Sequence, residues 1–335
     1  MTTASVLVVT YNSSSTIEQC LLSLNDQSFK NFEVLVLDNH SEDETRNIIG
    51  CLQPRLKFSF SSFYLDKNLG FAGGNNFLLR HATGVYIALL NPDAFADPRW
   101  LEAMILIQES HAEVGICASK LLTADGAFID SAGDGFSSVL KSFKRGEGKQ
   151  PNAYMKTEQV FGACAGAALY RRSMIEEIGF FDDDFFLIHE DADINFRAQL
   201  SGWDVIFVHD AIVYHKIHGS MGKMTDVQVY YNLRNLEFVR IKNVAFSMFI
   251  RHMPELFIGI IVEFIYFVVL HGKVRLYFIA KRDVIKHLSL MYEKRRALFR
   301  PNKKRTDQHI AKLITSIWNQ EFIWAKIKRF FFLHA

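Results

Sequence analysis

Short apolar runs alternate with amphipathic stretches through the N-terminal third of the chain. Three runs of aliphatic and β-branched residues predict buried strands at Ser5–Thr10, Phe32–Leu37 and Val85–Leu90. Helical spacing of apolar positions predicts helices between them, at Ile17–Leu24, Glu42–Leu52 and Asn75–His81. Because strands separated by helices pair in parallel, the pattern predicts an α/β fold with a mostly parallel, Rossmann-like central sheet flanked by helices.

The pattern loosens in the middle of the chain. Polar residues and glycines crowd 125–151, which predicts a loop or hairpin region over a site. Farther on, we expect a helix at Asp191–Leu200 that stops before Gly202, and short strands at Val205–Val208 and Ala211–Tyr214.

One predicted strand leads into a carboxylate. The apolar run Tyr86–Leu90 is followed by Asn91, Pro92 and Asp93, and pairing should stop at the proline because it cannot donate to a ladder. Open α/β sheets bind ligands at the carboxyl ends of their strands, so Asp93 is a candidate for holding a divalent cation on a diphosphate. His215 is a candidate second ligand, which favours Mn²⁺ somewhat. The alternatives are a turn or helix-cap aspartate and a structural histidine.

Two further segments near the N-terminus suit a nucleotide. Asp38 ends the second strand and can accept a hydrogen bond from a uracil or thymine imide; the alternative is a helix cap. The glycine-rich segment Asn68–Asn76 predicts a loop opening a helix, whose backbone amides suit an anion. It matches neither a Walker loop nor GxGxxG. Its candidate donor-binding residues are Asn68, Gly73 and Asn75.

A second acidic cluster follows the aromatic run at 185–188. Glu190 and Asp191 begin the predicted helix, and their side chains must diverge, so one of them can face a site. A general base must be ionised and within hydrogen-bond reach of a hydroxyl, a role that we assign to Asp191. The alternative is an acidic helix cap partnered by Arg197.

Charge divides the chain into two regions. Residues 1–240 carry 20 Lys and Arg against 30 Asp and Glu, whereas residues 241–335 carry 18 against 6 and are rich in Phe. We therefore expect a catalytic domain at 1–240 and a basic helical region at 241–335.

The basic region contains an apolar run, Leu256–Leu270, interrupted only by Glu263. Its 15 residues are fewer than the roughly 20 that span a bilayer, so we expect a shallow amphipathic helix. Basic clusters, including one within Lys326–Phe332, fit an anionic lipid surface. The alternatives are a helical subdomain packed on the body and a basic dimerisation surface.

Cysteine usage and the N-terminus bear on the compartment. The four cysteines, Cys20, Cys51, Cys117 and Cys164, form no CxxC pair, which argues against a zinc knuckle or a disulfide framework. A strand begins almost at once, leaving no room for a signal peptide. We expect a peripheral protein on the cytoplasmic face of the bacterial inner membrane, with no nucleic-acid partner.

Taken together and in order, these motifs resemble glycosyltransferase family 2, and most of all bacterial rhamnosyltransferase-like enzymes of cell-surface polysaccharide (O-antigen or capsule) assembly. The likeness covers roughly residues 4–240. The matching strings are Val9–Asn12, Leu37–Ser41, Asn68–Asn76, Leu90–Asp93, Gly162–Arg172, Gly179–Asp182, Glu190-Asp191 with Arg197, Gly202-Trp203, His215 and Asn232–Asn235.

The resemblance implies a GT-A fold and inversion at the anomeric carbon. It implies a nucleotide-diphosphate-sugar donor, either a dTDP- or a UDP-sugar, and a polyprenyl-linked saccharide acceptor. Thr10, Tyr11 and Asn12 would then lie at the nucleotide, and Asp38 would bind its base.

The same resemblance implies roles in the chemistry. Asp93 matches the last Asp of the metal-binding DxD motif, His215 the later metal ligand and Asp191 the general base. The first acid of DxD is Asn91 here, which leaves one metal carboxylate fewer for Mg²⁺ or Mn²⁺. Residues expected to contact the acceptor or support the site are Glu190, Arg197 and Trp203.

Two rival functions remain open at this point. A nucleotidyltransferase also uses metal carboxylates on an α/β sheet, but typically has a basic glycine-rich phosphate loop near the N-terminus. A non-catalytic sugar-nucleotide-binding scaffold would tolerate loss of Asp191, which this chain retains. The sequence leaves the sugar, the acceptor, the linkage and the oligomeric state open.

Overall fold

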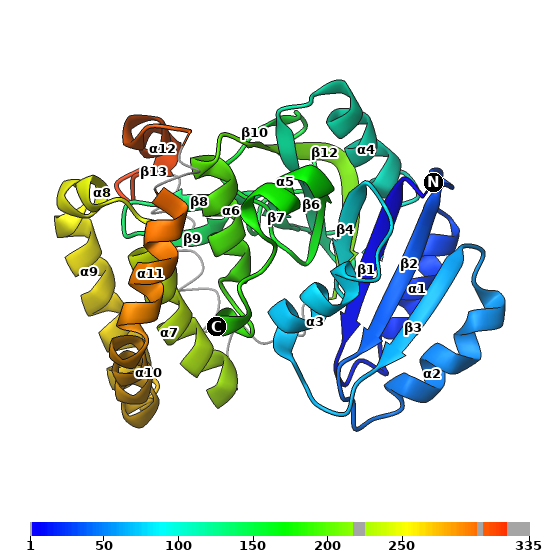
Figure 1. The fold of residues 1–335 in the computed structure, drawn as a ribbon, viewed down its shortest axis with the longest axis horizontal. Helices are drawn as coiled ribbons and strands as arrows, with labels where there is room; N and C mark the ends of the chain where they lie inside the picture. The colour runs from blue at the N-terminus through cyan, green and yellow to red at the C-terminus, as the bar shows by residue number, and fades with distance from the viewer. Residues whose placement is uncertain (1, 217–224, 300–303, 320–335) are drawn as a thin grey trace.

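A mixed central sheet of ten strands organises the molecule (Figure 1). The computed structural model describes residues 2–216, 225–299 and 304–319. In spatial order the strands are β10 (Glu158–Gln159), β12 (Asp204–His215), β6 (Val114–Thr123), β11 (Ala167–Arg171), β4 (Tyr86–Leu90), β1 (Ala4–Thr10), β2 (Phe32–Asp38) and β3 (Ser59–Tyr64). Two more lie off this path, β5 (Ala94–Ala96) on β12 and β7 (Ile129–Ala132) on β6.

The two halves of the sheet differ in strand direction. Strands β4, β1, β2 and β3 are parallel, as predicted for the N-terminal third. In the other half β11 runs antiparallel to both β4 and β6, and β5, β7 and β10 also pair antiparallel. The prediction of a mostly parallel sheet therefore holds for the N-terminal half but is wrong for the sheet as a whole, which is mixed. The reason is that β11 follows hairpins, which reverse direction, rather than a helical crossover.

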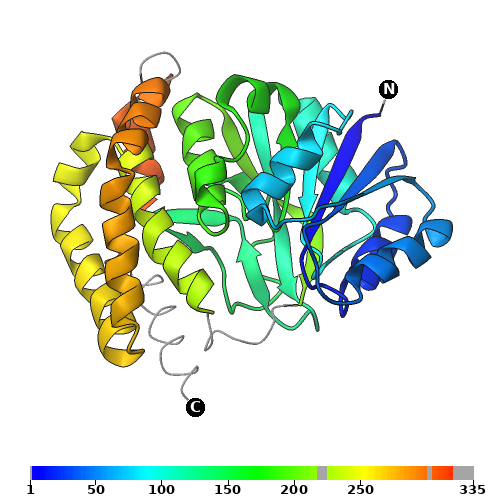
Figure 2. The ribbon, with the colours of Figure 1, turned by 60° about the horizontal axis from the view of Figure 1, so that its bottom comes forward.

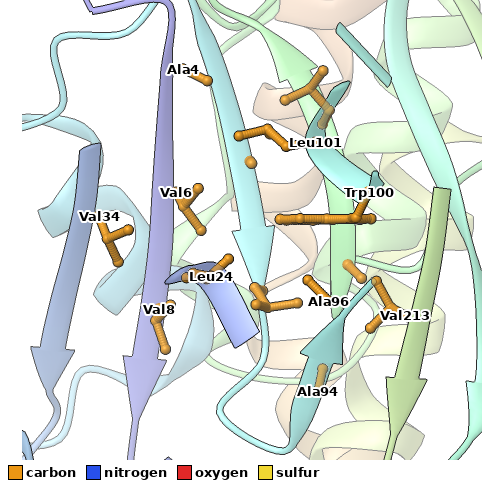
Figure 3. Packing of buried hydrophobic residues seen from close by; sticks show 14 of the residues in the cluster. Ala4, Val6, Val8, Leu24, Val34, Ala94, Ala96, Trp100, Leu101 and Val213 are labelled. Carbon is orange, nitrogen blue, oxygen red and sulfur yellow. The ribbon is translucent and has the colours of Figure 1, made fainter. Parts of the chain in front are cut away.

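Helices bury both faces of the sheet, which explains the uninterrupted apolar runs. On one face lie α1 (Ile17–Asn25), α2 (Thr45–Leu52) with η1 (Gln53–Arg55), and α4 (Trp100–Ser110). Figure 3 shows Trp100 near Leu101, Ala96 and Val213 in this core, with Val6 farther away on β1. Trp100 is fully buried, and its indole N–H donates to the Ser119 hydroxyl at 2.8 Å.

The other face carries α3 (Gly70–Leu79), α5 (Arg172–Ile178) and α6 (Glu190–Leu200). Helix α3 was expected to start at Asn75 but starts at Gly70, so most of the glycine-rich segment is helix rather than loop. Gly70 has a φ of +73°, and a Cβ on Gly74 would lie 2.8 Å from Val9. The glycines thus allow a tight entry into α3 and its close packing on β1.

The region at 125–151 forms hairpins, as the sequence suggested. Strand β7 pairs with β6, and β8 (Asp134–Ser137) pairs with β9 (Lys141–Lys144) and with β13 (Ile314–Thr315) in a second, three-stranded sheet. Other boundaries shift: α2 starts at Thr45 instead of Glu42, and one bulged strand, β12, replaces two predicted short strands.

Helices also fill the C-terminal region, as predicted. They are α7 (Asp226–Asn243), α8 (Phe246–Arg251), α9 (Met253–Phe264) with its π-helical continuation η3 (Ile265–Leu270), α10 (Val274–Lys286), α11 (Leu288–Phe299) and α12 (Asp307–Leu313). Figures 1 and 2 show this layer beside α6, with α9 outermost. A shared apolar core, including Phe161, Phe196 and Met291, joins it to the body. The basic segment at Lys326–Phe332 lies outside the described residues.

One helix of the described chain is long and apolar enough to cross a membrane. It comprises α9 and η3, Met253–Leu270, with 18 residues, a mean hydropathy of 2.1 and 11% of the stretch buried. The prediction that the apolar run is too short to span is therefore wrong, because the helix begins before Leu256. Length and composition alone do not separate a spanning helix from one lying on a membrane.

Candidate active site

The candidate site lies along the carboxyl edge of the parallel strands. The register pairs Thr10 with Asp38, so β1 and β2 end side by side, and β4 ends at Leu90 on the other side of β1. The segments that leave these strands therefore meet at one edge, where open α/β sheets bind ligands.

Asp38 has one committed and one unpaired carboxylate oxygen. The side chain is fully buried, and its Oδ2 accepts hydrogen bonds from the Arg46 Nε at 2.5 Å and the Ser41 amide at 3.2 Å. Its Oδ1 is buried and has no hydrogen-bond partner. A buried acceptor without a donor is costly, so this atom suits an N–H group of a ligand.

Thr10, Tyr11 and Asn12, at the end of β1, differ in exposure. Thr10 and Asn12 shape the loop, and Tyr11 is exposed. Thr10 is buried, and its hydroxyl donates to the Leu37 carbonyl at 3.2 Å. Asn12 has a φ of +50° and accepts a hydrogen bond from the Glu42 amide at 2.8 Å. Tyr11 is 47% exposed, so its ring is the one open to a nucleotide.

The glycine-rich segment contributes unequally to this edge. The Asn68 Oδ1 accepts from Asn39, the residue after Asp38, at 2.9 Å and from the Gly70 amide at 2.7 Å. Asn75 is buried, and its amide donates to the Phe71 carbonyl within α3. A Cβ on Gly73 would lie 3.0 Å from Leu69. The structure thus brings Asn68 to the nucleotide edge, whereas Asn75 and Gly73 serve the packing of α3.

The sheet register brings Asp93 and His215 together. Strand β12 pairs His215 with Ala94, and the Lys216 amide donates to the Asp93 carbonyl at 2.8 Å. The His215 Nε2 lies 3.4 Å from the Asp93 Oδ1, while its Nδ1 lies 3.0 Å from the Asp130 Oδ2. Both side chains are partly exposed, so a ligand can approach them.

This pair fits a divalent cation as part of its shell. Burial lowers the pKa of His215, but the hydrogen bonds to Asp130 and Asp93 outweigh it and raise the pKa to about 9. A cation between Asp93 and His215 would take the place of that proton, while Asp130 would hold the imidazole from behind. Across the described ranges no group of three or more His, Cys, Asp and Glu residues is arranged for a metal, so diphosphate oxygens would have to complete the shell.

Asn91 stands where the first DxD acid would be. Its backbone N–H donates to the Gly166 carbonyl at 2.8 Å. A Cβ on Gly166 would lie 3.0 Å from the nitrogen of the Asn91 side chain. The small residue at 166 therefore makes room for the Asn91 side chain beside the end of β4.

Asp191 is held at the N-terminus of α6. Its Oδ1 accepts the Ala192 amide at 2.7 Å, and burial raises its pKa although backbone N–H groups and Lys144 oppose this. The preceding Glu190 is 7% exposed, and burial and the charge of Asp191 raise its pKa well above the usual value. The ionised form of Glu190 is therefore strongly disfavoured, and Asp191 is the better candidate for a base.

Arg197 and Trp203 lie away from this edge. Arg197 pairs with Asp193 at 2.8 Å and donates to the carbonyls of Ile178 and Gly179 at 2.7 Å. The Trp203 indole donates to Glu177 at 3.0 Å. Both side chains fasten α6 and β12 to the end of α5, which is a supporting role rather than contact with an acceptor.

The sequence did not reveal three titratable groups that the hairpins bring to the site, Asp130, Asp134 and Lys144. Asp130 on β7 accepts from the Lys144 Nζ at 2.6 Å as well as contacting His215. Asp134 on β8 is buried, and burial and the charge of Asp191 raise its pKa to about 8. The sequence signal for these groups was the pair Asp130 and Asp134, on either side of Gly133 in a polar hairpin region. Their partners His215 and Asp191 are far away in the sequence, so the signal did not indicate a site.

Comparisons with known proteins show which family models and proteins the chain resembles. The model of glycosyl transferase family 2 matches residues 5–179, and that of glycosyl transferase family group 2 matches residues 152–226. The chain is 24% identical over 244 residues to an N-acetylglucosaminyl-diphospho-decaprenol L-rhamnosyltransferase of Mycobacterium tuberculosis, covering 64% of this chain and 76% of the relative. For eight curated relatives, the matched part of this chain covers between 36% and 76% of the relative's own length.

Two solved structures share the fold. Staphylococcus aureus TarS 1–349 in complex with UDP-GlcNAc has a TM-score of 0.59 at 17% identity and covers 92% of each chain. The mannosyltransferase PcManGT from Pyrobaculum calidifontis, in complex with GDP-Man and Mn²⁺, has a TM-score of 0.55 at 16% identity, covering 87% of this chain and 86% of its own.

Proposed function

This chain belongs to glycosyl transferase family 2 and is a nucleotide-sugar-dependent glycosyltransferase, and from that premise we propose that it moves a sugar, with inversion, onto a hydroxyl of a lipid-linked saccharide. The observation that carries the proposal is the meeting of Asp93 and His215 at 3.4 Å. The two residues are distant in the sequence, and they meet beyond the end of β4, on the sheet edge that also holds Asp38.

The donor in this proposal is a UDP- or dTDP-sugar. The buried, unpaired Oδ1 of Asp38 would accept the imide N–H of uracil or thymine, and Tyr11 would lie against the nucleotide. Guanine and adenine present different hydrogen-bonding edges, so the pyrimidine imide fits this single acceptor better. The proposal leaves the transferred sugar, rhamnose included, to a donor screen.

The proposed transfer reaction develops negative charge on the departing diphosphate and requires removal of a proton from the acceptor hydroxyl. A bound Mg²⁺ or Mn²⁺ would supply the positive charge that stabilises the departing diphosphate, and Asp93 and His215 would hold it. Asp191 accepts the proton of the acceptor hydroxyl as that oxygen attacks the anomeric carbon from the face opposite the diphosphate. Its raised pKa makes it a better base than an ordinary aspartate.

The proposed acceptor is polyprenyl-linked. Support comes from the mycobacterial relative, an N-acetylglucosaminyl-diphospho-decaprenol L-rhamnosyltransferase. Such an acceptor keeps its lipid in the bilayer, so the enzyme must work at a membrane surface. In this proposal that surface is the cytoplasmic face of the bacterial inner membrane.

The outer face of α9 and η3 supports membrane binding. Large apolar side chains are exposed along it, among them Met253, Phe257, Ile261, Val262, Ile265 and Val269. Exposed basic side chains nearby include Arg251, Arg275, Arg282 and Lys286. Basic groups beside exposed apolar ones suit an anionic lipid surface.

One buried ion pair favours a helix lying on the membrane over one crossing it. Glu263, in the middle of the apolar helix, is 8% exposed and pairs with Lys281 of α10 at 2.9 Å. Lys281 also pairs with Glu237 of α7 at 2.6 Å. A spanning helix would have to break this link and place Glu263 in lipid, which is costly.

A donor screen tests the proposed function. Purified protein is incubated with Mn²⁺, a panel of UDP-, dTDP- and GDP-sugars and a polyprenyl-diphosphate-linked saccharide, and free nucleoside diphosphate is measured. We expect acceptor-dependent release from one UDP- or dTDP-sugar. Release of sugar 1-phosphate with transfer of the nucleoside monophosphate would instead support a nucleotidyltransferase, and tight donor binding without turnover would support a scaffold.

A further inference from the structure

The segment that leads to Asp191 has an unusual backbone. Residues 182–189, called the lead segment here, connect α5 to α6 through η2 (Asp183–Phe185). Phe186, Ile188 and His189 have φ values of +61°, +65° and +72°, although none is glycine. Such conformations persist only where the surroundings over-determine them, and they gather at functional sites. The lead segment therefore needs an external support.

Helix α7 supplies that support through one side chain. The Asn235 amide nitrogen lies 2.7 Å from the Phe185 carbonyl oxygen and 2.8 Å from those of Leu187 and Ile188. Asn235 is fully buried, and its own oxygen accepts the Arg234 Nε at 2.9 Å. The two N–H groups of one side-chain amide are thus shared among three backbone carbonyls of the segment immediately before α6.

The opposite side of the lead segment is held by α3. The Ala72 amide donates to the Phe186 carbonyl at 3.1 Å. A Cβ on Gly70 would lie 2.4 Å from that same carbonyl oxygen, so only glycine leaves room for it. The lead segment is therefore clamped between α3 and α7, and His189, the last residue before Glu190, is held to Asn232 of α7 at 3.2 Å.

We propose that Asn235 is a positioning residue of the transfer reaction, which fixes the start of α6 and thereby the direction of the Asp191 carboxylate. This inference rests on the role proposed above for Asp191. Asn235 contacts the backbone of the lead segment and not the sheet edge that holds Asp38. Its loss should therefore misplace the base while leaving donor binding intact.

The same helix offers a matched control. Asn243 is also fully buried on α7, and its amide donates to the Asp193 carboxylate at 2.8 Å. Within the described residues, the Asn243 side chain makes no hydrogen bond to the lead segment. Asn243→Ala should cost stability in the same way as Asn235→Ala, since each leaves buried groups unpaired. Only Asn235→Ala should disturb the bends before Asp191.

The experiment compares three variants of the full chain, Asn235→Ala, Asn243→Ala and Asp191→Asn, with saturating metal and acceptor. We expect Asn235→Ala to lower kcat about 10- to 100-fold, because a displacement of about 1 Å can have such an effect. Donor Kd should change less than about twofold, and Asn243→Ala should keep most of its kcat at a similar fall in Tm.

A pH profile adds a readout that a general loss of stability would not move. Burial raises the pKa of Asp191, and the charged or titratable groups facing it are Glu190 on α6, Asp134 on β8, Lys144 on β9, Cys164 before β11 and Tyr170 on β11. A loosened lead segment admits water, so the acidic limb of kcat should shift to lower pH in Asn235→Ala and stay in place in Asn243→Ala.

A second variant approaches the same segment from the other side. Gly70→Ala forces the Phe186 carbonyl away without touching Asn235, and it should reproduce the fall in kcat and the pH shift if Asn235→Ala fails to fold. Equal kcat in Asn235→Ala and Asn243→Ala, or in Gly70→Ala and wild type, would overturn the positioning role. Normal turnover by Asp191→Asn would instead overturn the proposed base, which keeps the two failures distinct.

Discussion

The donor side and the chemical side of the site are built in different ways. The donor side, residues 4–93, is a regular succession of parallel strands and helices, and its candidate residues follow strands along the chain. The chemical side joins elements distant in sequence: His215 meets Asp130 across 85 residues, and Asn235 reaches Phe185 across 50. The difference suggests that donor binding and proton transfer can be damaged separately.

The largest expected effect is on the chemical side. Asp191→Asn keeps an acceptor for the Ala192 amide but cannot take a proton, so kcat should fall by about 10²–10⁴-fold with unchanged donor affinity. Steady-state kinetics with calorimetric donor binding measure both. Asp226→Asn, at an exposed carboxylate on α7, should behave as wild type. Near-normal turnover by Asp191→Asn would remove the base from the mechanism.

Removal of the metal should affect both sides at once. Asp93→Ala should weaken both metal and donor binding, because the cation is expected to bridge the carboxylate and the diphosphate. His215→Ala should act in the same direction, more mildly. Titration of Mn²⁺ and Mg²⁺ against turnover, with the metal stripped by EDTA at the start, measures the loss. Full wild-type activity in excess EDTA would show that the metal-dependent version is wrong.

Asp130 offers a milder test of the same site. Asp130→Asn weakens the support behind His215, so the metal concentration for half-maximal turnover should rise about 10- to 100-fold, with kcat restored at high metal. Asp125→Asn, on an exposed carboxylate in the same hairpin region, is the control and should leave the titration unchanged. A loss of kcat that no metal concentration restores would assign Asp130 a different role.

The smallest effect on turnover with a soluble acceptor should come from the outer helices. The double variant Phe257→Asp, Val262→Asp should no longer float with anionic liposomes, while its activity on a short-chain acceptor should persist. Leu106→Asp, at an exposed position on α4, should float as wild type. Salt should weaken the attraction only partly, because apolar insertion is not screened. If the wild-type protein stays at the bottom with both anionic and neutral liposomes, the membrane role is wrong. The apolar face would then be better explained as a contact between copies of the chain.

The sequence predicted the donor side well because its signals are local. Strand periodicity placed β1, β2 and β4 within a residue or two, and the carboxyl ends of parallel strands share an edge. Propensity misled at α3, where Gly70 and Gly74 suggested a loop but serve close packing of a helix. The antiparallel β11 was missed because strand direction depends on the preceding hairpins, which residue periodicity does not encode.

The chemical side was predicted only in part. Motifs singled out Asp93, Asp191 and His215, and the structure brings Asp93 and His215 together. No local pattern indicated that Asp130 would lie behind His215 or that Asn235 would contact the lead segment. Those contacts depend on tertiary packing of hairpins and helices. Arg197 was expected either to contact the acceptor or to support the site, and its guanidinium binds Asp193 and backbone carbonyls at the end of α5.

Donor affinity measured side by side in Asp38→Asn and Asp191→Asn tests the separation of the two sides most directly. Titration calorimetry with the cognate nucleotide sugar and Mn²⁺ should show about tenfold or greater weakening in Asp38→Asn, since a hydrogen bond to a charged group contributes about 1.5–3 kcal/mol. Asp191→Asn should bind as tightly as wild type. Equal weakening in both variants, or a loss confined to Asp191→Asn, would contradict the account.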